Sequence, residues 1–335
     1  MSRSSSARFE IKYLVFGQIT RDYIIPYFGK PANDIAGGNA LYTAVGAAIW
    51  DEGIGIISQV GENYPFQELL DLQIHGIDVE GVTILARNLD LRRFHSRHSQ
   101  KENKKSSPVG DYSNSNHVFP PGLIDFQNPG SGKRLVSQQK EIPPRYQDAS
   151  AAHFCAQEST SLILTLGNLR KFSIKTTSIA PSDDLMKNNQ YSKLASLIHG
   201  ATISIISEKQ LRTLFPNPNM EIWQLMEHFA SIGNEIIVCR RGQKGQLVFD
   251  TVGKKRWQIP AYPARVMNPT GAGDAYCGGF MVGYCRNYDP LEAALYGNVS
   301  ASMVLDGIGI YHPLNSINGL KFARLERIRR YTRII

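Results

Sequence analysis

A glycine-rich stretch with a single carboxylate lies late in the chain and reads Asn268-Pro269-Thr270-Gly271-Ala272-Gly273-Asp274. Gly271 and Gly273 permit tight turns and a close approach of the backbone to a ligand. The apolar run that starts at Ala275 predicts that a helix begins here. Because the free N–H groups of a helix N-terminus and the positive end of the helix dipole attract anions, we expect an anion site at this point.

Asp274 falls in the first turn of this predicted helix, beside the place where a phosphate would lie. A carboxylate there suits a general base that takes a proton from an attacking hydroxyl. The N–H groups of Gly271, Ala272 and Gly273 would hold the charge that develops on a transferred phosphoryl group. The alternative is an ordinary glycine-rich loop in which Asp274 only complements the helix dipole. The full string, late in a chain of alternating strands and helices, favours the catalytic interpretation.

Strands and helices alternate along most of the chain, as the runs of apolar residues indicate. Residues 11–16 and 54–60 are rich in β-branched and aromatic side chains and each end at a glycine, which predicts buried strands. Residues 39–50 and 66–75 show the composition and spacing of helices. Later strands are expected near residues 150–154, 173–179, 202–206, 235–239 and 246–250, and later helices near 162–171, 186–199, 209–215, 220–232, 273–285 and 290–305. This alternation predicts an α/β sheet covered by helices.

A polar segment at residues 97–145 interrupts the alternation. It is rich in Ser, Asn, Lys, Pro and Gly. We expect an insertion or long loop with little regular structure here.

The formal net charge of the 335-residue chain is +8, which raises the question of a nucleic-acid partner. Residues 92–105 and 321–335 each hold six basic residues and one acidic residue, so each tract is net +5 and the remainder is net −2. A basic groove across the whole fold is therefore not expected, and nucleic-acid binding ranks last among the function classes. The second tract also has apolar residues at helical spacing, which predicts an amphipathic helix packed on the domain through Leu325, Ile328, Tyr331 and Ile335.

The cysteines, the N-terminal residues and the hydropathy of the chain indicate where in the cell the protein is expected. The four cysteines form no CxxC pair and the eight histidines show no metal-ligand spacing, so His153 and His199 are interpreted as structural. Residues 1–8 are rich in Ser and Arg and no apolar segment follows them, so no secretory signal is expected. The sequence contains no run of 18 apolar residues, so we expect no membrane span. We therefore expect a cytoplasmic protein with no membrane partner.

The string from Asn268 to Asp274, followed by Ala275-Tyr276-Cys277-Gly278-Gly279, resembles the PfkB (ribokinase-like) family of carbohydrate kinases. The resemblance covers roughly the whole chain apart from the polar insertion. It implies a three-layer α/β/α sandwich with a small β-sheet lid, in one kinase domain spanning residues 9–335. Lid elements are then expected near residues 18–36 and 80–130, with the insertion near 97–145. The implied reaction transfers the γ-phosphoryl group of ATP, with Mg²⁺, to a hydroxyl of a small sugar-like or nucleoside-like substrate.

The resemblance also assigns substrate-binding residues in the first part of the chain. Asp22, in Gly17-Gln18-Ile19-Thr20-Arg21-Asp22, corresponds to the family's carboxylate that contacts sugar hydroxyls, although a turn residue would also explain it. Gly37 and Gly38 correspond to the di-glycine that lets the backbone approach the substrate, and a helix-start turn is the alternative. Tyr42 stands where the family commonly has Asn, and it either stacks on a substrate ring or fills a helix face.

Nucleotide-binding residues are implied near the end of the chain. Arg241, Gly242 and Gly245 resemble the family's nucleotide loop, although a hairpin turn would explain these glycines equally well. Asn298 falls where the family contacts adenine. In the first basic tract, Arg92, Arg93 and His95 lie nearest the predicted lid and are expected closest to the pocket.

Besides Tyr42, the sequence departs from the family in the anion motif and in a motif tied to Mg²⁺. The first residue of the anion motif is Asn268 where the family usually has Asp, so binding of a monovalent cation is left open. The family's Asn-x-x-Glu motif, tied to Mg²⁺ and phosphate, appears as Ser207-Glu208-Lys209-Gln210. Either Glu208 compensates or Mg²⁺ is held through water and ATP.

Three function classes follow from these residues. The first is an ATP-dependent kinase. The second is a ligand-binding or regulatory protein of the same fold with weak or no kinase activity, motivated by Ser207, Gln210 and Asn268. The third is a nucleic-acid-binding protein, which rests on net charge alone. Pairing of the lids into a homodimer and the identity of the acceptor are left open by the sequence.

Overall fold

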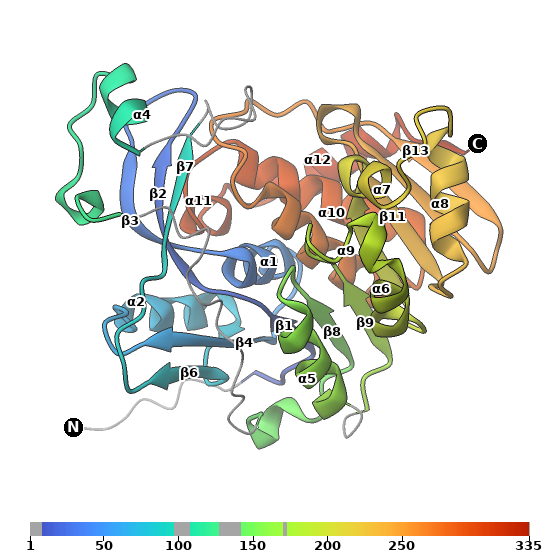
Figure 1. The fold of residues 1–335 in the computed structure, drawn as a ribbon, viewed down its shortest axis with the longest axis horizontal. Helices are drawn as coiled ribbons and strands as arrows, with labels where there is room; N and C mark the ends of the chain where they lie inside the picture. The colour runs from blue at the N-terminus through green and yellow to red at the C-terminus, as the bar shows by residue number, and fades with distance from the viewer. Residues whose placement is uncertain (1–8, 97–107, 127–141, 170–172, 335) are drawn as a thin grey trace.

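A large twisted sheet forms the centre of the protein in the computed structural model, which describes residues 9–96, 108–126, 142–169 and 173–334 (Figure 1). Its strand order is β14-β13-β12-β11-β10-β9-β8-β1-β4-β5, with β6 paired to β4. Pairing is parallel from β5 to β11 and antiparallel from β11 to β14. The strands are β1 (Tyr13–Phe16), β4 (Ile54–Gly61), β5 (Ile77–Asp78), β6 (Val82–Leu85), β8 (Ala151–Phe154), β9 (Thr176–Ile179), β10 (Ile203–Ser207), β11 (Ile236–Arg240), β12 (Gln246–Asp250), β13 (Lys255–Ile259) and β14 (Arg333–Ile334).

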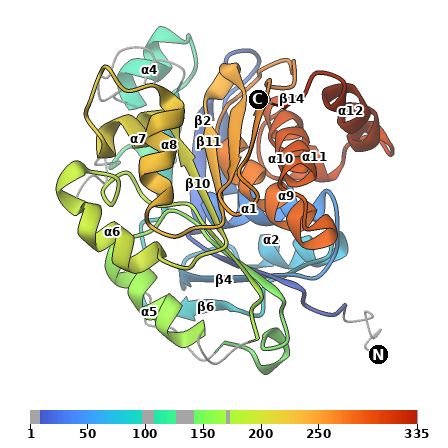
Figure 2. The same ribbon diagram turned by 90° about the vertical axis from the view of Figure 1, so that its right-hand side faces the viewer.

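Helices cover both faces of this sheet, which separates them in Figure 2. One face carries α1 (Asn39–Ala48), α2 (Gln67–Leu70), α9 (Ala272–Asn287), α10 (Pro290–Leu305), α11 (Tyr311–Leu314) and α12 (Leu320–Arg329). The other carries α5 (Ser159–Leu169), α6 (Tyr191–Ile198), α7 (Glu208–Leu214) and α8 (Ile222–Ala230). Each helical layer shares an apolar core with the sheet. The predicted three-layer α/β arrangement is therefore confirmed.

The central strands are apolar on both faces because helices bury both of them. All residues of β1, β4 and β8 are buried. Such continuous apolar runs, without alternation, are typical of parallel strands between two helical layers. Phe16 of β1 and Phe154 of β8 stack with ring centroids 4.9 Å apart on the face covered by α5 to α8.

Glycines let α1, α9 and α10 pack with their backbones nearly in contact. A side chain at Gly46 of α1 would overlap the backbone of Ala275, and one at Gly278 of α9 would overlap the backbone of Thr43. On the opposite side of α9, Gly279 leaves room for Ser300 of α10. The start of α9 is therefore held by close packing on two sides.

A second, separate sheet contains three strands in the order β3-β2-β7, namely β2 (Thr20–Ile25), β3 (Ala32–Gly37) and β7 (Arg92–Ser96). It has its own apolar cluster, to which α4 (Pro108–Asn114) contributes Tyr112 and a short 3₁₀ turn contributes Leu123. Because residues 108–126 include this helix and turn, the described part of the predicted polar insertion has more regular structure than we expected. Residues 97–107 and 127–141 lie outside the described parts of the chain.

Several element boundaries differ from the prediction for local reasons. Residues 66–75 form only the short α2 followed by the 3₁₀ helix η1 (Asp71–His75), which ends at Gly76 with a φ of 75°. The predicted helix at 186–199 consists of η4 (Asn188–Gln190) and α6. The strands β5, β6, β13 and β14 are additional to the predicted ones, and two of them are only two residues long.

The basic tail packs on the domain as an amphipathic helix, as predicted. Its buried and exposed residues differ in part from the predicted ones. Leu325 and Ile328 of α12 are buried, but Tyr331 lies beyond the helix and is 61% exposed. Arg324 points inward, where it pairs with Asp306 and is itself buried. Ile335 lies outside the described residues.

Candidate active site

The glycine-rich stretch forms the loop that leads into α9, as predicted from its sequence. Gly271 precedes the helix with a φ of 77°, in the left-handed region that favours glycine. Asn268 is buried, and its Oδ1 accepts hydrogen bonds from N and Oγ1 of Thr270 at 3.3 and 3.0 Å, which closes the turn. No side chain caps α9. No side chain therefore accepts from the first N–H groups of this 16-residue helix, as an anion site requires, although those of Ala272 and Asp274 donate to the carbonyls of Pro269 and Gly271 at 3.3 and 3.1 Å.

Asp274 lies in the first turn of α9 and is largely buried. Burial raises its pKa from the ordinary 3.8 to about 6, Arg240 and His95 lower it, and the nearby Asp22 raises it further. Asp22 of β2, His95 of β7 and Arg240 of β11 therefore lie near enough to the Asp274 carboxylate to influence its charge. A carboxylate with a pKa near the working pH suits a general base.

Asp22 belongs to the small sheet and is 1% exposed. Its Oδ1 accepts a hydrogen bond from Oγ1 of Thr20 at 2.6 Å and lies 3.5 Å from Nε2 of His95. Asp22 therefore sits within a strand, and the alternative of a turn residue is excluded. His95 is the residue of the first basic tract that faces this carboxylate.

The di-glycine makes room for neighbouring polar groups. A side chain at Gly37 would overlap the carboxylate of Asp22 on the paired strand, and one at Gly38 would overlap the carbonyl of Gln18. Gly38 has a φ of 101°, which L side chains rarely adopt. The local geometry beside Asp22 and Gln18 therefore requires both glycines, whether or not a substrate approaches the backbone here.

Tyr42 lies on α1 and is 1% exposed. A side chain at Gly271 would overlap its ring, so the ring packs directly beneath the anion loop. Its Oη is buried without a hydrogen-bond partner among the described residues. Burial raises its pKa, and the charges of Asp22 and Asp274 raise it further. Of the two sequence interpretations, this position favours a packing role over stacking on a substrate.

Asn39, the first residue of α1, was not singled out from the sequence. Its Oδ1 accepts from the N–H of Gln18 at 2.7 Å, and its Nδ2 donates to the carbonyl of Ala156 at 2.8 Å. It therefore joins the segments that follow β1 and β8. The sequence held no signal for this role, because a lone Asn after two glycines reads as a helix start.

Two of the residues assigned to the nucleotide, Gly245 and Asn298, lie along the segment that follows β13. A side chain at Gly245 would overlap the carbonyl of Ile259. Asn298 of α10 donates from Nδ2 to the carbonyl of Pro260 at 2.7 Å and accepts at Oδ1 from the N–H of Tyr262 at 2.9 Å. The amide of Asn298 is thus used by the backbone of this segment. Gly242 lies in the β11–β12 turn with a φ of 57°.

Glu208 and its neighbours are engaged in contacts other than those of a metal site. The carboxylate of Glu208 pairs with Arg212 and Arg241, each at 2.9 Å. Ser207 and Gln210 form a reciprocal capping box at the start of α7, with bonds of 2.8 and 3.1 Å. Within the described ranges, no group of three His, Cys, Asp or Glu side chains could hold a metal ion. The Ser-x-x-Gln spacing is a known sequence signature of this cap, and we did not identify it.

Arg92 differs from its predicted place near the pocket. Its guanidinium pairs with Asp90 and Asp125, each at 2.7 Å, and donates to the carbonyl of Gly122. It therefore ties β7 to the segment that follows α4. Arg92 was expected among the residues closest to the pocket, but two carboxylates already balance its charge.

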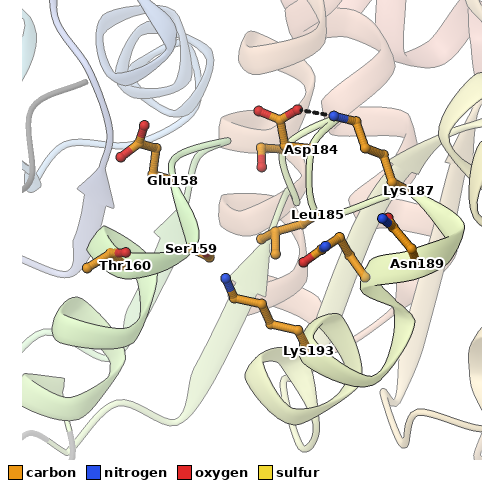
Figure 3. Close-up of a pocket in the computed structure, with 10 residues that line it drawn as sticks. Glu158, Ser159, Thr160, Asp184, Leu185, Lys187, Asn189 and Lys193 are labelled. Carbon is orange, nitrogen blue, oxygen red and sulfur yellow. Dashed lines mark hydrogen bonds and ion pairs between the residues drawn. The ribbon is translucent and has the colours of Figure 1, made fainter. Parts of the chain in front are cut away.

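A cavity of about 390 Å³ opens at the carboxyl ends of β8 and β9. Figure 3 shows Lys193 of α6 extending toward Ser159, with the ion pair of Lys187 and Asp184 (2.8 Å) on another side of the cavity. Glu158 and Thr160 also line it. None of the residues predicted from the sequence lines this cavity.

Comparison with known proteins agrees with this geometry. Residues 153–317 match the sequence model described as the pfkB family of carbohydrate kinases. The chain belongs to the pfkB family. This match includes the anion loop and Asp274, and it ends just before α12.

Two curated relatives of this pfkB protein are kinases by name. It is 23% identical to a cytidine kinase of Thermococcus kodakarensis over 282 residues, which cover 83% of this chain and 90% of the relative. It is 25% identical to a nucleoside kinase of Methanocaldococcus jannaschii over 312 residues, which cover 89% and 91%. The prediction of a kinase is confirmed by these matches.

The fold of this pfkB protein is that of ribokinases. A crystal structure of a putative ribokinase II from E. coli in complex with ATP and Mg²⁺ superposes with a TM-score of 0.68 at 17% identity, covering 95% of this chain and 99% of the other. The predicted ribokinase-like fold class is thereby confirmed. Helices in the described part of the chain lack the length and apolar character needed to cross a bilayer.

Proposed function

We propose that this protein transfers the γ-phosphoryl group of ATP to a hydroxyl of a nucleoside-like or sugar-like acceptor. Asp274 is the general base, and the backbone of Gly271, Ala272 and Gly273 is the anion site. The observation that carries the proposal is the position of Asp274. It lies at the uncapped start of α9 with its pKa raised to about 6, close to Asp22 of the small sheet.

The reaction needs one proton transfer and one displacement at phosphorus. Asp274 takes the proton of the acceptor hydroxyl as that oxygen attacks the γ-phosphorus. The bond from the γ-phosphorus to its bridging oxygen breaks, and ADP leaves with the electron pair. The first N–H groups of α9 face the charge on the transferred group, and Tyr42 supports the loop from below.

The acceptor lies between the small sheet and the start of α9 in this proposal. Asp22 accepts hydrogen bonds only, and His95, at 35% side-chain exposure, adds a second polar group beside it. Such a pair suits neighbouring hydroxyls of a ribose-like ring. The names of the two curated relatives, a cytidine kinase and a nucleoside kinase, support nucleosides as the first acceptors to test.

ATP and Mg²⁺ fit the residues to different degrees. The start of α9, which no side chain caps, fits the phosphates of a nucleotide, and the space beside its two glycines is taken by the Tyr42 ring and the Arg240 guanidinium. The residues at the family's Mg²⁺ position do not fit a protein-held ion, because two arginines occupy Glu208 and the capping box uses Ser207 and Gln210. Mg²⁺ that enters on the nucleotide, with waters as further ligands, agrees with its usual coordination.

A coupled assay of ADP release with a panel of nucleosides and sugars tests the proposal. We expect turnover with at least one acceptor and none in its absence. The product, identified by mass spectrometry, should carry one phosphate on an acceptor hydroxyl. Failure of every acceptor, in a protein that binds ATP, would contradict the proposal.

A binding or regulatory protein of the same fold is the second candidate, and the engaged side chains at Ser207, Glu208 and Gln210 favour it. This candidate predicts that a nucleoside raises the melting temperature without any product. The same acceptor panel, read by thermal shift in the presence of an ATP analogue, separates the two candidates.

A further inference from the structure

Arg240 ends β11 directly beneath the anion loop. Its Nη1 donates to the carbonyl of Gly273 at 2.6 Å. A side chain at Gly273 would overlap Nη1, so glycine at this position makes room for the guanidinium. The loop thus rests on Arg240 on one side and on the ring of Tyr42 on another.

In the described part of the chain, this guanidinium has no carboxylate partner. Among residues 9–96, 108–126, 142–169 and 173–334, no Asp or Glu lies within ion-pair distance of Arg240, and its Nε is buried without a hydrogen bond. The neighbouring Arg241, in contrast, pairs with Glu208 at 2.9 Å. A partly buried, unpaired charge is costly unless negative charge reaches it. A phosphoryl group at the anion loop would bring such charge.

We propose that Arg240 is a positioning residue for phosphoryl transfer, which fixes the Gly273 carbonyl and supplies a permanent positive charge beneath the anion loop. This role rests on the proposed kinase function. The arginine acts through Gly273 and Asp274, and it is assigned no contact with a substrate. A guanidinium suits the task because it stays charged at any pH that proteins experience.

The electrostatics of Asp274 agree with this role. The groups that influence or face its carboxylate are Arg240 on β11, Asp22 on β2, His95 on β7 and Tyr42 on α1, together with the buried thiols of Cys155 and Cys277. Arg240 is the largest influence that lowers the pKa of Asp274 against the effect of burial. Removal of its charge should therefore raise that pKa, so that a smaller fraction of the base is ionised at a given pH.

The test compares Arg240→Gln, Arg240→Lys and the control Arg256→Gln. Arg256 lies on β13 of the same sheet, where it pairs with Glu227 and contacts Trp223, away from the anion loop. In Arg240→Gln we expect kcat to fall on the order of ten-fold or more, with little change in the acceptor KM. The acidic limb of its pH–kcat profile should move to higher pH. Arg240→Lys should recover part of both effects, and Arg256→Gln should match the wild type.

A second measurement does not depend on turnover. The ¹³C carboxyl signal of Asp274, assigned from its loss in Asp274→Asn, should titrate at higher pH in Arg240→Gln than in the wild type. Melting temperatures show that each variant is folded. An active wild type whose Arg240→Gln variant keeps kcat, the pH limb and the titration midpoint overturns this inference alone. A wild type that transfers phosphate to no acceptor overturns the proposed function, and the role of Arg240 with it.

Discussion

The ring of Tyr42 occupies the space that a side chain at Gly271 would need. A residue of α1, early in the chain, therefore sets the position of a loop that lies near its end. The anion loop can approach α1 this closely because Gly271 has no Cβ and takes a φ of 77°.

Replacement of Gly271 by Ala should abolish most activity. The added methyl group would overlap the Tyr42 ring, and the left-handed backbone would cost about 1 kcal/mol more. We expect kcat to fall by roughly 100-fold or more, because a small misplacement of reacting groups has such effects. The matched control is Gly167→Ala in α5, where nothing lies within 4 Å of an added Cβ. Full activity of Gly271→Ala would show that the loop does not need this geometry.

Replacement of Tyr42 by Phe should leave activity nearly unchanged and should not lower stability. The hydroxyl is buried without a partner among the described residues, so its removal relieves an unsatisfied polar group. Thermal melts and acceptor KM values check this expectation. A large rise in KM would instead show that the hydroxyl binds the acceptor, as the alternative interpretation of Tyr42 holds.

The capping box at α7 should contribute to stability alone. Ser207→Ala removes the bond to the N–H of Gln210, and such caps are worth about 1 kcal/mol. Urea unfolding should show this loss in the free energy of unfolding, with kcat at saturating Mg²⁺ close to that of the wild type. A strong rise in the Mg²⁺ requirement of Ser207→Ala would place the residue in metal or phosphate binding after all.

Ionised Asp274 should reduce the stability of the fold. Its folded pKa of about 6 exceeds the ordinary 3.8, so between these values the folded protein holds a proton that the unfolded chain has released. The contribution of this group to the free energy of unfolding therefore falls as pH rises through this window, by up to about 3 kcal/mol. Asp274→Asn should raise the melting temperature at pH 7.5 and change it little at pH 4. A gap that does not widen with pH would contradict the raised pKa.

Patterns local in sequence made the sheet and the anion loop predictable. Apolar strands such as β4 and the Gly271–Asp274 string each carry their own signal, because burial on both faces and a helix start depend on neighbouring residues. Pro290–Leu305 was predicted with the bounds that α10 has. The fold class followed from this alternation together with the family resemblance.

Contacts between distant segments could not be predicted in the same way. Arg240 appeared only as the end of a strand, and nothing in its neighbours indicates that it reaches Gly273. The amide of Asn298 was expected near adenine, but it bonds to the backbone beside Pro260. Arg92 was expected close to the pocket, and its ion pair with Asp125, 33 residues away, has no local signal in the sequence. Each of these depends on three-dimensional proximity that a single sequence does not encode locally.

If Asp274 is the base for phosphoryl transfer, its carboxylate controls the rate of single-turnover transfer from γ-labelled ATP to an identified acceptor. We expect Asp274→Ala and Asp274→Asn to slow this step on the order of 10² to 10⁴-fold, with acceptor and ATP binding largely retained. The wild-type rate should rise with pH through about 6, as the carboxylate ionises. Near-full transfer by Asp274→Ala would show that Asp274 is not the base.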